Sequence, residues 1–247
     1  MSIFKIKFSF LFWVTSFLTV ITGTFREYVF FMSLILIHEM GHALVAMLFH
    51  WKIKEIHIYP FGGVTLFEEK INRPMLEELC ILLAGPMIQI LYHGVLKTSC
   101  SLPIFSFYHH MLLFFNLLPI YPLDGGRLFF LFYQSFFPYL KSHKFMIMTS
   151  VFSLLFCLLL FSHYHFSYFL ILYFFFLFLK IIEEKRKEPF LFKKFLLERF
   201  LYSFSFPFYK KIEGLNVKKM YRVCNHFFHI QKKMVCERDI LTKMFDL

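Results

Sequence analysis

An apolar run from Leu34 to Met47, LILIHEMGHALVAM, contains one carboxylate and two imidazole side chains near its middle. It belongs to a longer apolar stretch, Tyr28–Phe49, which is long enough for a helix to cross about 30 Å of hydrocarbon. Ionisable side chains inside a membrane span are costly and tend to serve function. These three groups therefore constrain the fold and the chemistry more than any other feature of the sequence.

The composition favours a membrane protein with several spans. Of the 247 residues, 58% are hydrophobic and only 17% are charged, whereas soluble domains are about half apolar and about a quarter charged. We predict an all-α polytopic membrane protein of about six transmembrane helices. The expected spans are Phe8–Gly23, Tyr28–Phe49, Leu76–Leu96, Pro103–Pro122, Phe145–Phe161 and Phe166–Ile182.

The distribution of charge predicts the orientation. The N-terminus and the second and fourth loops together hold eight Lys/Arg, and the opposite loops hold only Arg26 and Lys97. The positive-inside rule therefore places both termini in the cytoplasm. From Glu183 onward the chain has 15 Lys/Arg against 8 Asp/Glu, which favours contact with an anionic lipid surface. Nucleic acid is the weaker alternative, because no recognition module accompanies the charge.

The second loop, residues 51–74, differs from a plain connector. Its segment KIKEIHIY alternates apolar and polar residues, which is typical of a strand, and PFGG then interrupts the alternation. We predict a membrane-associated, hairpin-like element that lines a protein cavity or a water-filled one, since strands exposed to lipid are not tolerated. Such an element offers a docking edge for an extended peptide.

The sequence divides into three predicted parts. Residues 1–182 form a transmembrane domain, and residues 183–205 form an amphipathic juxtamembrane linker with apolar residues at helical spacing beside basic ones. Residues 206–247 form a short cytoplasmic tail, whose last part is too short to bury much of a core by itself.

The segment HEMGH matches the pattern H-E-x-x-H. On a helix, His38 and His42 lie one turn apart on one face and can bind one Zn²⁺, while Glu39 beside them is a candidate general base. The metal activates water and the carboxylate takes its proton. In the alternative reading, the two imidazoles hydrogen-bond across helices and Glu39 pairs with a cation.

A catalytic zinc takes three protein ligands and keeps one open position. The candidate third ligand is Asp124 in NLLPIYPLDGGR, where Pro119 and Pro122 break the helix and Gly125 and Gly126 allow a tight turn. The second and fourth spans run in the same direction, so both motifs fall in the cytoplasmic half of the membrane. Alternatively, Asp124 is an ordinary turn residue.

Together these motifs resemble the site-2 protease family of intramembrane zinc proteases: HEMGH inside a span, NLLPIYPLDGG about 80 residues later, and LAGP at Leu83–Pro86. The resemblance implies one zinc ion per chain, held by His38, His42 and Asp124. It also implies that Glu39 activates water and passes the proton to the leaving amine. The implied substrate contacts are Asn116, Phe61, Gly62, Gly63 and Val64. For Asn116 a hydrogen bond between packed helices is an equal alternative, and LAGP fits close helix packing better than catalysis.

PFGG, the acidic residues after it and NRP are most similar to a sporulation branch of this family, over about residues 1–205. That likeness implies a membrane-associated substrate, the sigma-K precursor, together with membrane-protein inhibitors and a place in the forespore outer membrane facing the mother cell. In that branch the C-terminus is a cystathionine-β-synthase-like (CBS) domain. Here VKKMYRVCNHFF and CERDILTKMF are similar to its first and last helices, with too few residues between them for strands, so we expect a truncated remnant.

Two other functions stay open at this point. The chain could cut anti-sigma factors or signal-peptide remnants, although relatives with that role often carry a further domain. It could also be a non-catalytic membrane scaffold. The sequence leaves the oligomeric state undetermined.

Overall fold

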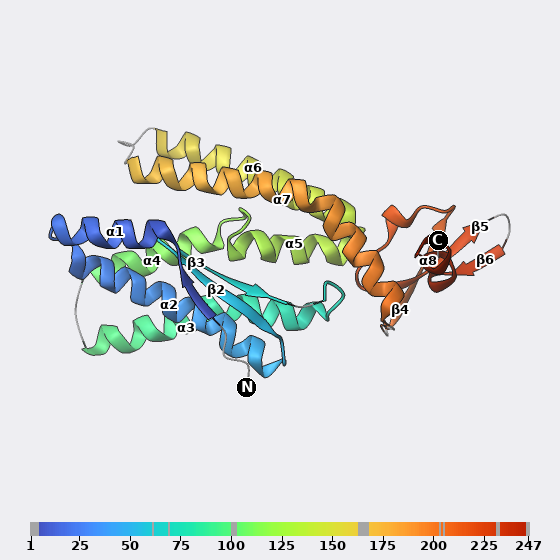
Figure 1. Cartoon of the computed structure of the whole chain (residues 1–247), viewed down its shortest axis with the longest axis horizontal. Coiled ribbons are helices and arrows are strands. Elements are labelled where there is room, and N and C mark those ends of the chain that lie inside the picture. Colours follow the sequence, from blue (N-terminus) through green and yellow to red (C-terminus); the bar gives the residue numbers. More distant parts are fainter. Residues whose placement is uncertain are drawn as a thin grey trace. The chain divides into compact units, whose positions relative to one another are not determined.

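The computed structural model describes residues 5–60, 62–68, 70–99, 103–162, 168–202, 204, 206–230 and 233–245. The chain splits into two compact units. The first comprises Met1–Glu69 and Leu76–Leu117, and the second comprises Lys70–Met75 and Leu118–Leu247. Figure 1 traces the chain through both units from the N-terminus to the C-terminus. Phe61, one of the predicted substrate contacts, lies outside the described residues.

The first unit combines four helices with a small sheet. Its elements are β1 (Lys5–Phe8), α1 (Phe10–Ile21), α2 (Phe25–Leu48), β2 (Ile53–Tyr59), β3 (Gly62–Phe67), α3 (Met75–Ser99) and α4 (Pro103–Leu117). The strand order is β1-β2-β3, with β1 parallel to β2 and β2 antiparallel to β3. The second loop therefore forms a hairpin, as its alternating pattern predicts.

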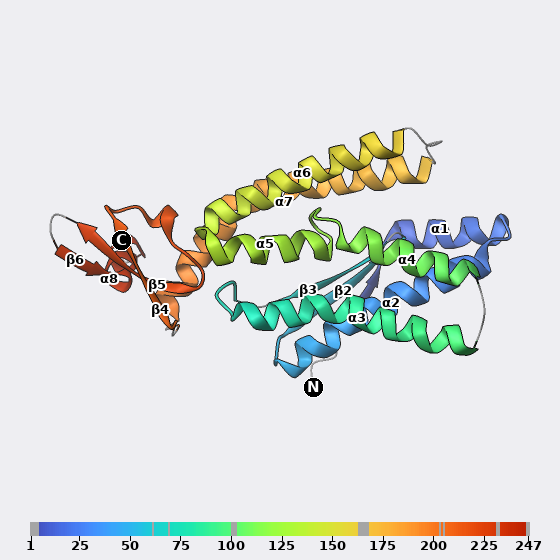
Figure 2. The same ribbon diagram turned by 180° about the vertical axis from the view of Figure 1, so that it is seen from behind.

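The hairpin packs onto the helix that carries the HEMGH motif. Ile56 and Ile58 of β2 are buried in one core with Leu34 and Ile35 of α2 and Leu112 of α4. Inward residues alternate with more exposed ones along β2, because successive side chains of a strand point to opposite faces. Figure 2, seen from behind, shows the strands running beside α2 and α3. The sheet therefore reaches the middle of α2, where the ionisable groups lie.

Three of the described helices are long and apolar enough to cross a membrane, namely Phe25–Leu48, Met75–Leu96 and Tyr139–Phe161. The first predicted span forms the shorter apolar helix α1, of 12 residues. Since about 20 residues are needed to cross the hydrocarbon, α1 and the 15-residue α4 do not meet that length by themselves. The total of six spans stays a prediction.

The second unit contains the remaining helices and a second sheet. Its elements are α5 (Asp124–Phe136), α6 (Tyr139–Ser162), α7 (Tyr168–Leu201), β4 (Phe208–Glu213), the short 3₁₀ helix η1 (Val217–Lys219), β5 (Cys224–Ile230), β6 (Lys233–Cys236) and α8 (Glu237–Phe245). Helices α6 and α7 lie side by side in both views (Figures 1 and 2). The predicted sixth span and the amphipathic linker share the single helix α7.

The two sheets correct the prediction of an all-α fold. In the tail, VKKMYRVCNHFF forms η1 and the start of β5 instead of a helix, whereas CERDILTKMF forms α8 from Glu237 onward. Strand β4 pairs parallel with β5, and β5 pairs antiparallel with β6. This segment forms a strand because alternate side chains face the core: Cys224, His226 and Phe228 are buried, and the residues between them are half-buried.

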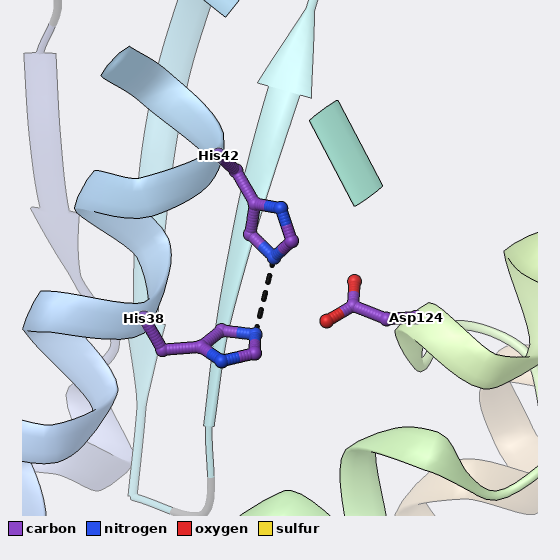
Figure 3. Close-up of side chains that lie close together, drawn as sticks. All are labelled: His38, His42 and Asp124. Atoms are coloured by element: carbon purple, nitrogen blue, oxygen red, sulfur yellow. Dashed lines mark hydrogen bonds between the residues drawn. The ribbon is translucent and has the colours of Figure 1, made fainter. Parts of the chain in front are cut away.

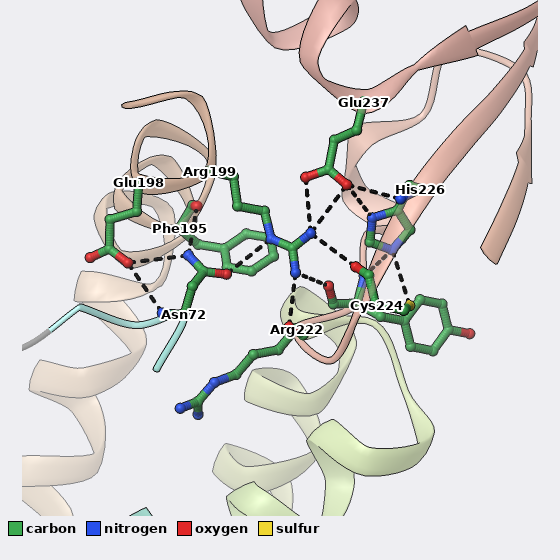
Figure 4. Close-up of polar contacts among 9 residues, drawn as sticks. Asn72, Phe195, Glu198, Arg199, Arg222, Cys224, His226 and Glu237 are labelled. Atoms are coloured by element: carbon green, nitrogen blue, oxygen red, sulfur yellow. Dashed lines mark hydrogen bonds and ion pairs between the residues drawn. The ribbon is translucent and has the colours of Figure 1, made fainter. Parts of the chain in front are cut away.

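The tail also has a larger core than its length predicts. Ile212, Met220 and Phe228 are buried in one cluster with Phe195 and Leu196 of α7. The tail does not depend on its own residues alone, because α7 supplies an apolar face against which the small sheet packs. A buried polar network around Arg199 joins the same elements (Figure 4).

Candidate metal centre and active site

The two histidines of HEMGH lie one turn apart on α2 and are both buried. Their ring centroids are 4.8 Å apart, and their Nε2 atoms face each other at 3.1 Å (Figure 3). Helical spacing alone places the two rings on one face, because residues four apart are neighbours on a helix.

The opposite nitrogen of each ring faces helix α3. Nδ1 of His38 is 3.0 Å from Oε1 of Gln89, and Nδ1 of His42 is 2.7 Å from the Ile81 carbonyl oxygen. Both oxygens accept, so each Nδ1 donates and carries a proton, and Nε2 is the nitrogen of each ring that is left to bind a metal ion. If both Nε2 atoms are unprotonated, their lone pairs repel at 3.1 Å unless a cation lies between them. The two Nε2 atoms are therefore close enough to bind the same cation.

Asp124 is the first residue of α5 and is also buried. Ligand atoms of His38, His42 and Asp124 all lie within 4.8 Å of one another (Figure 3). Two imidazole nitrogens and one carboxylate oxygen are a ligand set that catalytic zinc takes, with a fourth position left for water or substrate. These three residues therefore fit a zinc ion.

The segment before Asp124 is irregular, as its prolines predict: α4 ends at Leu117 and α5 begins at Asp124. The glycines after it correct a detail, because Gly125 and Gly126 belong to the first turn of α5 and do not form a separate tight turn. A Cβ at position 126 would lie 2.6 Å from the Ile120 carbonyl carbon. Gly126 therefore allows the irregular segment to pass close to the start of α5.

Glu39 is buried beside the histidine pair and is held by strand β3. Its Oε2 accepts a 2.6 Å hydrogen bond from the Thr65 hydroxyl. A Cβ on Gly63 would overlap the Glu39 side chain, so β3 packs directly against the carboxylate. The sequence reasoning missed Thr65. The period of two along β3 was the available signal, since it places Thr65 on the same face as Gly63.

The remaining predicted substrate contacts, and the LAGP motif, lie in different surroundings. The Asn116 amide, at the end of α4, has its Nδ2 atom 3.3 Å from Nε2 of His38. Gly62 has open space where a Cβ would be, and Val64 is half-buried. In LAGP, a Cβ on Gly85 would overlap the His42 ring, so this motif provides the close helix packing expected of it. The sequence reasoning did not single out Gln89 or Ile81.

Comparisons with known proteins identify the family of the chain. The chain matches Peptidase family M50 over residues 27–102 and 97–160. It is 37% identical over 200 residues to stage IV sporulation protein FB of Bacillus subtilis, covering 76% of this chain and 68% of that protein. It is 36% identical over 125 residues to a zinc metalloprotease of Methanocaldococcus jannaschii, covering 46% of this chain and 36% of that protein.

A solved structure, the site-2 protease from Methanocaldococcus jannaschii, superposes with a TM-score of 0.59 at 25% identity, over 74% of this chain and 93% of that one. Fold, ligand set and sequence together define a zinc metalloendopeptidase of the site-2 protease type. The chain belongs to Peptidase family M50. The predicted family, the predicted zinc cofactor and the predicted enzyme class are confirmed.

Proposed function

We propose that this protein cuts a peptide bond within or near the membrane-embedded segment of another protein, with Glu39 as the acid–base residue. One observation carries the assignment: a buried carboxylate, fixed by Thr65 at 2.6 Å, adjoins a buried histidine pair on the same helix. An unused buried carboxylate would be costly to keep, since burial disfavours its charge.

Each residue has a distinct role in this proposal. His38, His42 and Asp124 hold the zinc ion, which when bound polarises water and the scissile carbonyl. Glu39 takes the proton of the attacking water and delivers it to the leaving amine. Asn116, whose amide lies beside His38, donates to the substrate backbone or to the scissile carbonyl oxygen.

The hairpin provides the place for the substrate. In the order β1-β2-β3 the strand β3 lies at an edge of the described sheet. Its residues Gly62 to Val64 include Gly63, which packs against Glu39. An extended substrate can pair with such an edge through its backbone. Extension is required, because a helical segment hides its scissile carbonyl in its own hydrogen bonds.

We further propose that the substrate is a sigma-factor precursor, specifically that of sigma K, cut during endospore formation. The likeness to a relative named as a sporulation protein supports this choice. It also supports a location in the forespore outer membrane with both termini in the mother-cell cytoplasm, and control by membrane-protein inhibitors. In this arrangement residues 1–182 carry out the cleavage. The basic linker 183–205 lies on anionic lipid, and the tail 206–247 contacts the cytoplasm.

The test is co-expression with a sigma-K precursor, comparing wild type with Glu39→Gln. Removing the base should lower the cleavage rate at least ~10²-fold while one zinc per chain stays bound. Glu68→Gln, the same change at an exposed carboxylate after β3, is the matched control and should cleave like wild type.

The outcomes separate the parts of the proposal. A shortened sigma factor with wild type and Glu68→Gln alone establishes both activity and substrate. If none of the variants cuts but zinc is bound, the choice of sigma K is wrong, and anti-sigma factors and signal-peptide remnants are the next substrates. If none cuts and no zinc remains after gentle extraction, the scaffold function is the correct one.

A further inference from the structure

Gln89 lies in the middle of α3 with its side chain fully buried between α2 and α4. Its amide contacts residues on both of these helices. Oε1 lies 3.0 Å from Nδ1 of His38, and Nε2 lies 3.1 Å from the carbonyl oxygen of His109. A buried glutamine with partners on two neighbouring helices needs an explanation, because a buried amide end without a partner is destabilising.

The contact with His109 fixes which end of the amide faces His38. A backbone carbonyl can only accept a hydrogen bond, so the group beside the His109 oxygen must be the NH₂ of Gln89. The same NH₂ reaches Nδ1 of His109 at 3.3 Å, which can accept its second proton. The oxygen of the amide must then face His38. The orientation thus follows from the hydrogen-bond network.

The orientation of the amide in turn fixes the tautomer of His38. Because Oε1 of Gln89 only accepts, Nδ1 of His38 must donate and therefore carries the proton. In the neutral ring Nε2 is then the unprotonated nitrogen, and it is the one that faces His42 at 3.1 Å. A histidine binds zinc through an unprotonated nitrogen, so this tautomer is the one that can bind the ion.

The second histidine is oriented differently. Its Nδ1 lies 2.7 Å from the Ile81 carbonyl oxygen, a main-chain group that no substitution at position 81 removes. Gly85, on the same helix, leaves room for the His42 ring. On His38, by contrast, the partner of Nδ1 is a side chain that substitution can remove.

We propose that Gln89 is the positioning residue of the metal centre, which holds His38 in the zinc-binding tautomer and is itself held by His109 on α4. The proposal rests on the proposed role of His38 as a zinc ligand. Gln89 touches neither substrate nor zinc and acts through the ring of His38. Outer partners of zinc-bound histidines typically contribute 10–100-fold to metal affinity.

The experiment measures the zinc affinity of the full-length protein in detergent by competition with a chelator of known strength. Gln89→Leu removes the acceptor and should weaken zinc binding 10–100-fold. Gln89→Glu keeps an oxygen toward His38 and should stay within tenfold of wild type. Gln134→Leu is the matched control, since Gln134 is also a fully buried glutamine but bonds Arg222; its zinc affinity should be unchanged.

A second variant keeps the test decisive if Gln89→Leu does not fold. Gln89→Asn retains a polar amide but is one methylene shorter, so it cannot span His38 and His109 and should also weaken zinc binding at least tenfold. Wild-type zinc affinity in a folded Leu or Asn variant overturns the proposal. His38→Ala distinguishes the two levels: if it too keeps wild-type affinity, the assignment of the zinc ligands is wrong, and not only the role of Gln89.

Discussion

The Thr65 hydroxyl donates a 2.6 Å hydrogen bond to Oε2 of Glu39, and both side chains are buried. The two residues are 26 positions apart, on β3 and α2. Hydrogen bonds to charged groups are worth about 1.5–3 kcal/mol, so this contact can hold the carboxylate in one rotamer. The hairpin therefore orients Glu39, the residue proposed as the general acid–base.

Replacing Thr65 by Val, which has nearly the same shape, should lower kcat about tenfold or more, because the carboxylate loses its donor and its fixed position. Zinc content should stay at one per chain, since the hydrogen bond that is lost goes to Glu39 and not to a proposed zinc ligand. Thr65→Ser restores the hydroxyl and should recover most of the rate. Equal rates for Val and wild type in single-turnover cleavage would show that this contact is not needed for catalysis.

Gly63→Ala should impair activity for a steric reason. The added Cβ overlaps the Glu39 side chain, and inserting one carbon into a packed site typically costs 1–3 kcal/mol. We expect cleavage to fall about tenfold or more. Gly62→Ala is the matched control, because a Cβ there has no atom within 4 Å. A similar loss in both variants would indicate a general effect on the strand.

Gly85→Ala should weaken zinc binding, because its Cβ overlaps the His42 ring and forces the ring away from His38. The control on the same helix is Gly94→Ala, where a Cβ meets nothing within 4 Å. That change should raise helix stability by about 1 kcal/mol without altering zinc affinity. Chelator competition measures the zinc affinity of both variants. An unchanged affinity in Gly85→Ala would show that the close packing of Gly85 on the His42 ring is not needed for zinc binding.

The buried ion pair of the tail should control its stability. Glu237 accepts hydrogen bonds from Arg199 at 2.9 and 3.1 Å and from the His226 ring at 2.7 Å (Figure 4). Glu237→Gln leaves the Arg199 charge without its carboxylate and should cost about 3–5 kcal/mol. Asp239→Asn, an exposed carboxylate two residues along α8, should change stability by less than about 0.5 kcal/mol. Hydrogen exchange of residues 206–230 and 233–245 measures both, and equal protection in the two variants would contradict the prediction.

Acid should destabilise the same region of the tail. Burial alone would raise the pKa of Glu237, but the hydrogen bond from His226 and the charge of Arg199 outweigh it and hold the pKa below its usual range. Burial lowers the pKa of His226. In both cases the unfolded state binds protons more readily than the folded one, so the stability of the tail decreases as the pH is lowered. The loss should begin below about pH 6.5 through His226 and continue below about 4.3 through Glu237.

The Glu237→Gln variant should lack the lower part of this pH dependence, since the carboxyl group is gone. Hydrogen exchange of the tail, recorded from pH 7 to about pH 3, checks the sign. Protection that increases on acidification would contradict it.

Several features were predictable from short stretches of sequence. The helix around HEMGH, the hairpin after it and the helix break before Asp124 each follow from local periodicity or from proline. The tail was predicted less well: the same apolar residues that were interpreted as a helix form η1 and β5. Short apolar runs fit the period of a helix or that of a strand. Here the strand is stabilised by packing against Phe195 and Leu196, more than 20 residues away in the sequence.

By itself, the sequence placed the candidate groups of the site: a histidine pair with metal-ligand spacing beside a carboxylate inside an apolar helix, and a candidate third ligand in Asp124. Residues four apart on a helix must share a face, so this information is local. Only the tertiary structure decided how the groups are held, with Gln89 and Ile81 on the two rings and Thr65 on Glu39. These partners lie 26 to 51 residues away along the chain. Hydrogen bonds over such separations leave no periodic pattern, because they depend on which elements pack together.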